Sequence, residues 1–330
     1  MRNLMDLSIQ LIIFLQDNLS FLTPVMQFFT FLGNEEFYLG VMPILVWSFD
    51  HTLGLRVGVM LMLSGSVNSF FKFAFHQPRP YWVSRSVKLL TNPAEGFGLP
   101  SGHAQNAAST FGLLAAGIKQ KWLKGVVIFT IFMIAFSRVF LGVHSIQDIL
   151  LGLVVGSILL FAFFRIEKLL EEQITNLKPI TRIALIFAIS VTIALLGFLI
   201  INGQKNFQIP KDWVENALYA YPEESIDPFS ADGILTTSGA LFGLAAGGIW
   251  VQEKGGYAAK SGKLWQHLAR NVLGIAGVLL LWLGLGEILP ISDNLIGYVL
   301  RFFRYALVGV WVTGAAPLLF LRMKLAVEAE

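Results

Sequence analysis

Long blocks of apolar residues recur from one end of the chain to the other, separated by short polar connections. A helix needs about 20 mainly apolar residues to cross the hydrocarbon core of a bilayer, and nine windows of the chain have this character. They cover residues 24–49, 53–75, 101–118, 123–143, 146–164, 181–201, 234–251, 268–289 and 296–321. The pattern therefore predicts an all-α protein, a polytopic transmembrane helical bundle of about nine spans.

Polar residues interrupt the first of these windows. Asn34 and Glu35 follow Gly33 within it, which predicts a short helix, a break at Gly33 and a second helix that begins near Glu35. The number of spans is therefore expected to be roughly eight to ten.

Residues 1–20 differ from the windows because polar residues are mixed among the apolar ones. The segment lacks the small-residue cleavage site of a secretory signal. Its polar residues include Asp6, Gln10, Gln16 and Asp17. We interpret it as an amphipathic helix that lies in the membrane interface.

The composition agrees with a chain that lies mostly in lipid. Hydrophobic residues make up 55% of it and charged residues 14%, and the mean hydropathy is +0.67; a water-facing surface could not be built from this balance. The net charge of +3, without a basic stripe of interleaved aromatic residues, argues against nucleic acid as a partner. The absence of cysteine excludes disulfides and thiolate metal sites.

Lysine and arginine gather in every second connection, and cytoplasmic loops retain positive charge. These residues are Lys119, Lys121, Lys124, Arg165, Lys168, Lys178, Arg182, Lys254, Lys260, Lys263, Arg270, Arg322 and Lys324. The opposite face carries the acidic segment 202–233 and, by the same alternation, segments 76–100 and 142–148. We therefore expect these three segments to lie outside the cytoplasm.

The first block of candidate chemistry is FKFAFHQPRP, where Lys72 near the end of an apolar helix is followed seven positions later by Arg79. Arginine offers a planar fork for two phosphate oxygens and lysine a compact charge, so together they favour a doubly negative group. Cations at a membrane interface also commonly extend toward water. By themselves, Lys72 and Arg79 are therefore also consistent with ordinary cations at the membrane interface.

The second block is LPSGHAQN, where Pro100 and Ser101 begin an apolar helix. The first N–H groups of a helix are free, and with the Ser101 hydroxyl and the backbone at Gly102 they would form an anion site beside His103. Helix capping next to an interfacial histidine explains the block equally well.

The third block is SRVFLGVHSIQD, with Arg138 near the end of one span and His144 and Asp148 at the start of the next. Four residues of separation place His144 and Asp148 on one helix face. The carboxylate can then accept the proton of one ring nitrogen and leave the lone pair of the other exposed as a nucleophile. A structural pair that closes a helix end is the alternative.

Together the three blocks resemble the signature of the type 2 phosphatidic acid phosphatase superfamily, which includes lipid phosphate phosphatases and vanadium-dependent haloperoxidases. The matching residues are Lys72 with Arg79-Pro80, Pro100-Ser101-Gly102-His103, and Ser137-Arg138 with His144 and Asp148. The resemblance covers roughly residues 21–167. Within it, GNEEFY at 33–38 loosely resembles the sphingosine phosphate phosphatase branch. Haloperoxidase activity is disfavoured because this chain is membrane-bound.

The resemblance implies a metal-independent phosphatase that needs no cofactor and forms a phosphohistidine. In that mechanism His144 attacks phosphorus, Asp148 orients His144, and His103 protonates the leaving oxygen. The residues that would hold the other phosphate oxygens are Lys72, Arg79, Ser101, Gly102 and Arg138. Fixed cations can supply the charge stabilisation that phosphoryl transfer requires.

The chain is expected to divide into an interfacial helix at 1–20, a catalytic helical core at 21–167 and a C-terminal transmembrane extension of unknown role at 168–330. In the extension, TTSGALFGLAAGG at 236–248 is either a degenerate repeat of the segment that begins at Ser101 or a small-residue packing face, and we favour packing.

Our main hypothesis is an integral phosphatase of the plasma or inner membrane, or an equivalent membrane, with its active site on the extracytoplasmic or lumenal face. Its substrate would be a phospholipid, polyprenyl or sphingoid phosphate or diphosphate. A lipid phosphotransferase that uses the same histidine is one alternative, and a non-catalytic transporter or scaffold that binds phosphate lipids is another. Homo-oligomerisation stays open.

Overall fold

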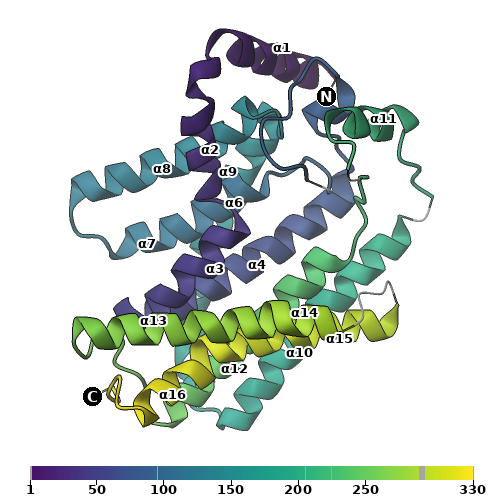
Figure 1. Ribbon diagram of the computed structural model, residues 1–330. Coiled ribbons are helices and arrows are strands. Elements are labelled where there is room, and N and C mark those ends of the chain that lie inside the picture. Colours follow the sequence, from purple (N-terminus) through teal and green to yellow (C-terminus); the bar gives the residue numbers. More distant parts are fainter. Residues whose placement is uncertain (1, 95, 205, 224, 290–293, 330) are drawn as a thin grey trace. The chain divides into compact units, whose positions relative to one another are not determined.

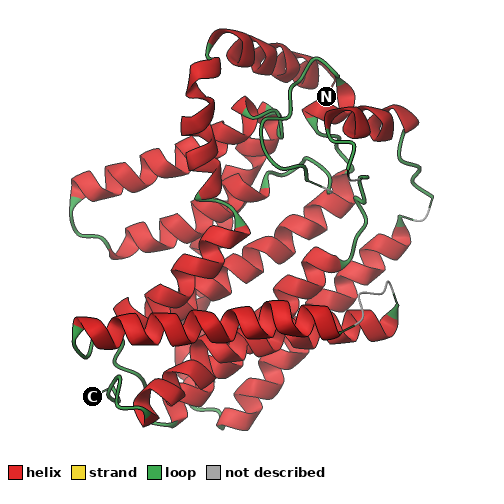
Figure 2. Ribbon diagram, viewed as in Figure 1, coloured by secondary structure: helices red, strands yellow, loops and turns green. Residues whose placement is uncertain are grey.

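A computed structural model describes residues 2–94, 96–204, 206–223, 225–289 and 294–329, and within these ranges every regular element is a helix (Figure 2). The first half of the chain forms α1 (Arg2–Asn18), η1 (Ser20–Leu22), α2 (Thr23–Phe31), α3 (Glu35–Ile44), η2 (Leu45–Phe49), α4 (His51–Phe75), α5 (Pro80–Val83), α6 (Gly102–Asn106), η3 (Ala107–Phe111), α7 (Gly112–Gly117), α8 (Lys121–Phe140) and α9 (Ile146–Thr175). The second half forms α10 (Pro179–Gly203), α11 (Lys211–Ala220), α12 (Asp232–Glu253), α13 (Leu264–Leu279), η4 (Leu280–Gly284), α14 (Leu285–Ile288), α15 (Leu295–Val310), η5 (Trp311–Ala315) and α16 (Ala316–Arg322). The all-α prediction is confirmed.

Seven helices in the described part of the chain are long and apolar enough to cross a membrane. They are His51–Val83, Lys121–Phe140, Ile146–Leu170, Pro179–Gly203, Asp232–Glu253, Leu264–Ile288 and Leu295–Arg322. Each coincides with one of the nine predicted windows. The other two windows, 24–49 and 101–118, consist of shorter helices, and the expected break at Gly33 lies between α2 and α3.

The N-terminal helix turns sharply into the next one. Leu4–Asn18 and Ser20–Phe31 meet at a bend of 86° and would count as an eighth span if they crossed the membrane together. Figure 1 shows this bend where α1 joins α2. Polar residues such as Asp6 and Asp17 are exposed on α1, as an interfacial helix requires.

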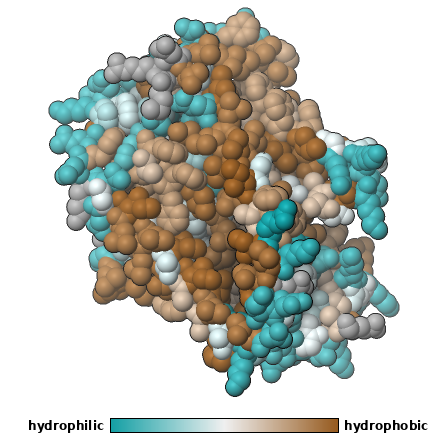
Figure 3. Space-filling view, turned by 180° about the vertical axis from the view of Figure 1, so that it is seen from behind, coloured by the Kyte–Doolittle hydropathy of each residue, from teal (hydrophilic) through white to brown (hydrophobic). Residues whose placement is uncertain are grey.

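Large apolar side chains cover much of the molecular surface. Figure 3 shows them as broad brown areas on the face in view. Examples on the long helices are Phe129, Phe132, Phe161, Leu199 and Leu280, whose exposed fractions range from 56% to 71%. Contiguous apolar surface of this kind is unfavourable in water and favourable against lipid tails. The chain is an integral membrane protein.

The chain forms two compact units that are interleaved along the sequence. Unit 1 consists of Met1–Phe37, Val67–Ala162 and Gly197–Ser230, and unit 2 consists of Tyr38–Ser66, Phe163–Leu196 and Ala231–Glu330. All candidate site residues lie in unit 1. Residues 204–230, which form most of the acidic segment after α10, belong to the same unit as the three blocks.

In unit 2, α12 and α15 pack closely because α12 presents glycines to its neighbour. A Cβ atom at Gly239 or at Gly243 would collide with the backbone carbonyl of Phe302 or of Ala306 respectively. The small residues at 236–248 are thus explained by helix packing, as expected.

Helix α1 is packed against the rest of unit 1 along one face. Met5, Ile9 and Ile12 are buried in a cluster that also contains residues of the turn after α8. Gln16 lies on the same face and makes buried hydrogen bonds: its Nε2 donates to the carbonyls of Lys88 (2.8 Å) and Phe140 (3.0 Å), and its Oε1 accepts from the Lys88 N–H (3.0 Å). This side chain ties α1 to the end of α8.

We expect Gln16→Leu to destabilise the protein by about 1–3 kcal/mol, because the buried carbonyl of Phe140 and the partly buried backbone groups of Lys88 would lose their partner. Thermal unfolding in detergent micelles measures this as a lowered Tm. Gln10→Leu is the matched control, since Gln10 is exposed on the same helix. Equal Tm values for the two variants would contradict the role assigned to Gln16.

Candidate active site

The start of α6 is fixed to the end of α4 by Asn68. Its side-chain Nδ2 donates to the Pro100 carbonyl (3.2 Å) and to Oε1 of Gln105 (2.9 Å). A Cβ atom at Gly102 would lie only 3.2 Å from the Asn68 Oδ1, so the backbone passes close to this amide. Asn68 is one helical turn before Lys72 and therefore shares a face of α4 with it. The sequence analysis did not single out Asn68.

Ser101 is fully buried at the first turn of α6. Its hydroxyl caps that helix by accepting the N–H of Ala104 at 3.5 Å. Its own N–H donates to the backbone carbonyl of Asp148 at 2.9 Å. The second and third blocks of the signature are therefore in direct contact.

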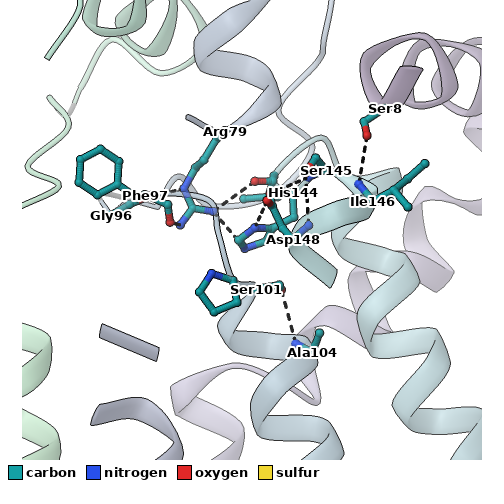
Figure 4. Close-up of polar contacts among 12 residues, drawn as sticks. Ser8, Arg79, Gly96, Phe97, Ser101, Ala104, His144, Ser145, Ile146 and Asp148 are labelled. Atoms are coloured by element: carbon teal, nitrogen blue, oxygen red, sulfur yellow. Dashed lines mark hydrogen bonds and ion pairs between the residues drawn. The ribbon is translucent and has the colours of Figure 1, made fainter. Parts of the chain in front are cut away.

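Arg79 is buried and surrounded by backbone carbonyls. Its Nε donates to Gly96 (2.7 Å), its Nη1 to Val143 (3.2 Å) and its Nη2 to Phe97 (3.2 Å). Its Nη1 also lies 3.1 Å from the Nε2 of His144. Figure 4 shows the guanidinium between the 96–97 loop and the imidazole. These bonds hold the first block against the third.

A tight turn after α8 places His144. Gly142 has φ of +80°, a conformation that favours glycine. The N–H groups of Val143 and His144 both donate to the carbonyl of Arg138 at 3.1 Å. The turn thus presents His144 directly beside the end of the helix that carries Arg138.

Asp148 holds the other side of the His144 ring. Its Oδ2 lies 3.3 Å from the Nδ1 of His144 and accepts the Ser145 N–H at 2.8 Å. Both side chains are almost completely buried. Asp148 Oδ1 is buried without a hydrogen-bond partner among the described residues.

These contacts select one tautomer of His144. A guanidinium can only donate hydrogen bonds, so the Nε2 that faces Arg79 must present its lone pair. The Nδ1 that faces the Asp148 carboxylate then carries the proton. The arrangement leaves the Nε2 lone pair directed at the Arg79 guanidinium.

Lys72, Arg79 and Arg138 all act electrostatically on His144, as does His103. The same three cations act on His103. Burial has the largest effect on His144, and these positive charges add to it, so that the pKa of the imidazole is lowered well below its usual value. The structure thus brings all three blocks together around an imidazole whose surroundings disfavour protonation.

Arg138 and His103 both contact a segment that the signature does not include. Nη1 of Arg138 donates to the Thr30 hydroxyl, while the Nε of Arg138 is buried and unpartnered within the described chain. The His103 Nε2 lies 2.9 Å from the Oδ1 of Asn34. The sequence analysis used Asn34 only as a marker of a helix break, and Thr30 carried no signal.

Aromatic residues from the segment after α10 cover one side of the site. His76 stacks on Phe207 with ring centroids 4.3 Å apart, and Phe97 packs edge-on against Phe229 at 5.2 Å. The ring of Trp82 also packs against the ring of Trp213. Phe97 is the residue whose carbonyl holds Arg79. Tyr81 and Trp82, which directly follow Arg79-Pro80 in the sequence, are buried in the core.

Two family models match the chain. The model described as "PAP2 superfamily" matches residues 53–171, which contain all three blocks. The model described as "PAP2 superfamily phosphatase, transmembrane extension" matches residues 235–328. The two matched segments lie in order along one chain, as a core followed by an extension.

The known proteins that resemble this chain differ in how much of it they match. Sphingosine-1-phosphate phosphatase 2 of Mus musculus is 29% identical over 135 residues, which are 39% of this chain and 38% of that protein. Glucose-6-phosphatase 2 of Homo sapiens is 22% identical over 303 residues, 83% of each chain. A solved transmembrane PAP2 type phosphatidylglycerolphosphate phosphatase from Bacillus subtilis is 21% identical, with a TM-score of 0.43 over 51% of this chain and 86% of that one. The chain spans about two fifths of the length of the first curated lipid phosphatases that it matches.

We expect histidine-selective ¹⁵N NMR in detergent micelles to show His144 as the neutral Nδ1–H tautomer at neutral pH. Because its pKa is lowered, the ring should stay neutral as the pH falls through the range where exposed histidines become protonated. Assignment uses the loss of the signal in His144→Gln. A protonated Nε2 at neutral pH would contradict the geometry described above.

Proposed function

Because the chain belongs to the PAP2 superfamily, we propose that it is an integral membrane phosphatase that hydrolyses a lipid phosphate or diphosphate through a phosphohistidine. The observation that carries the proposal is the position of the His144 Nε2, which is 3.1 Å from Arg79 in a site that gathers Lys72, Arg138 and His103. The expected core at 21–167 is the catalytic part in this proposal, with 1–20 at the interface and 168–330 as its extension.

In the first step the Nε2 lone pair of His144 attacks phosphorus and the bond from phosphorus to the leaving oxygen breaks. His103 gives its proton to that oxygen, so the lipid departs as an alcohol or, from a diphosphate, as a monophosphate. Asp148 keeps the Nδ1 proton in place and stabilises the positive charge that develops on the imidazole.

In the second step water attacks the phosphohistidine. His103, now unprotonated, takes a proton from that water, and the bond between phosphorus and Nε2 breaks. Inorganic phosphate is released and both histidines return to their starting states. His103 therefore gives one proton to the leaving group and recovers one from the water, while His144 forms and then breaks the bond to phosphorus.

Lys72, Arg79 and Arg138 would stabilise the phosphate charge without a metal ion. A phosphate that enters takes over the Arg79 N–H now directed at His144, and the unpartnered Nε of Arg138 offers a second donor. Ser101 and Gly102 would complete the cradle from the start of α6. Preorganised donors of this kind contribute strongly when water is excluded.

The substrate is proposed to be a phospholipid, polyprenyl or sphingoid phosphate, because the site lies in a chain whose surface is suited to lipid. One observation favours a second candidate. The similarity to a glucose-6-phosphatase extends over most of both chains, so a sugar phosphate is the alternative substrate class. A lipid phosphotransferase and a non-catalytic phosphate-lipid scaffold are the remaining alternatives.

The site is proposed to open on the extracytoplasmic or lumenal face of the plasma or inner membrane, or its equivalent. The distribution of lysine and arginine supports this orientation, because Lys119 just before α8 and Lys121 and Lys124 in its first turn lie at the opposite end of the helix from Arg138.

We expect the purified protein to release phosphate from at least one member of a panel of phosphatidate, polyprenyl phosphate, sphingosine 1-phosphate and glucose 6-phosphate, with EDTA present throughout. His144→Ala should lower kcat by about 10⁴-fold or more, because the nucleophile is lost. ³²P-labelled substrate should label the protein with an acid-labile, base-stable phosphohistidine.

His267→Ala is the matched histidine control, since His267 lies in unit 2, and it should keep wild-type turnover. Full activity of His144→Ala would overturn the proposed mechanism. Transfer of the label to an added alcohol in place of water would favour the phosphotransferase.

Labelling of single cysteines tests the orientation, and the natural chain has no cysteine to remove. In intact cells a membrane-impermeant maleimide should react with Lys211→Cys, whereas Lys121→Cys should react only after permeabilisation. Both positions are exposed. The opposite labelling pattern would place the site on the cytoplasmic face.

A further inference from the structure

The break between α2 and α3 forms the support on which His103 rests. Asn34 Oδ1 lies 2.9 Å from the ring Nε2, and the backbone carbonyl of Thr30 also interacts with the ring. The segment precedes the matched family region, which begins at residue 53. Its contacts with the site are therefore additional to the signature.

Gly33 lets the imidazole come close to this segment. A Cβ atom at Gly33 would lie 2.6 Å from the Cδ2 of His103, closer than real Cβ atoms approach. The ring therefore lies against the backbone at Gly33 while Asn34 holds its edge. This combination leaves His103 little rotational freedom.

Two residues of this segment contact two different residues of the site. Thr30 accepts a hydrogen bond from Arg138, a residue proposed to hold phosphate oxygens. Asn34 contacts His103, the residue proposed to protonate the leaving oxygen. Substitutions at the two positions should therefore disturb different parts of the reaction.

We propose that Asn34 is a positioning residue for the proposed reaction: its amide oxygen accepts the Nε2–H of His103, which fixes the ring and leaves Nδ1 as the nitrogen that gives its proton to the leaving oxygen. The inference rests on the proposed function. A neutral imidazole has one N–H, and a neighbouring acceptor decides which nitrogen carries it. Asn34 reaches the reacting atoms only through His103.

The leaving group provides a test that a merely structural role would not pass. The alcohol released from dioctanoyl phosphatidate needs a proton, whereas p-nitrophenolate is stable as an anion. Asn34→Ala should therefore lower kcat/KM for dioctanoyl phosphatidate by about 10- to 100-fold, which is part of the contribution expected from general acid catalysis. For p-nitrophenyl phosphate the loss should be no more than about 3-fold. The ratio kcat/KM is used because it reports the steps up to release of the leaving group.

Thr30→Val is the matched variant from the same segment. It removes the Arg138 contact and leaves Asn34 in place, so it should lower kcat/KM for both substrates by similar factors. Asn34→Asp keeps an acceptor at the same position and should restore most of the activity that Asn34→Ala loses on dioctanoyl phosphatidate. In a His103→Ala background, Asn34→Ala should cause little further loss, because the two residues act as one unit.

A similar loss on both substrates for Asn34→Ala, or a full additional loss in the His103→Ala background, would overturn the proposal.

A measurement that needs no turnover separates this failure from failure of the proposed function. Histidine-selective ¹⁵N NMR should show a protonated His103 Nε2 in the wild type and a changed signal in Asn34→Ala, whichever substrate is used. An unchanged signal would refute the role of Asn34 even in an active phosphatase.

Discussion

The buried hydrogen bond between Arg79 and His144 is the interaction on which the arrangement of the site depends. Arginine can only donate, so the nitrogen that it meets must carry a lone pair. Asp148 fixes the other nitrogen as the donor. The imidazole is thereby held neutral and aimed at positive charge, which is unfavourable for a protonated histidine and favourable for one that must attack an anion.

Burial of a cation is expensive unless its donors are satisfied, and two buried arginines, Arg270 and Arg138, differ in this respect. In unit 2, the buried Arg270 directs its guanidinium at the carbonyls of Trp47, Ala259 and Ser261 and at the Tyr257 hydroxyl. Every nitrogen of Arg270 has a partner, as a structural role requires. Among the described residues the buried Nε of Arg138 has no partner, which is why it is proposed as a donor to a phosphate oxygen.

Much of the architecture could be predicted from the sequence because lipid imposes a simple rule. Apolar windows of the required length become helices since no other element satisfies its backbone in a bilayer. Of the site, the residues with rare chemistry could be found: a histidine four positions before an aspartate, and cations at the ends of apolar helices. Their partners could not be found, because Arg79 is held by the backbone carbonyls of Gly96, Phe97 and Val143. Carbonyls occur at every residue and leave no pattern in the sequence.

The contribution of residues after α10 was equally hidden, for a related reason. Aromatic residues in a membrane protein are too common to signal a contact, yet Phe207 and Phe229 pack against His76 and Phe97. Phe97 holds Arg79 through its carbonyl, and Arg79 holds the lone pair of His144. A chain of direct contacts thus runs from the segment after α10 to the proposed nucleophile. Arg79 is therefore linked by direct contacts to residues that lie between the two matched family regions, 53–171 and 235–328.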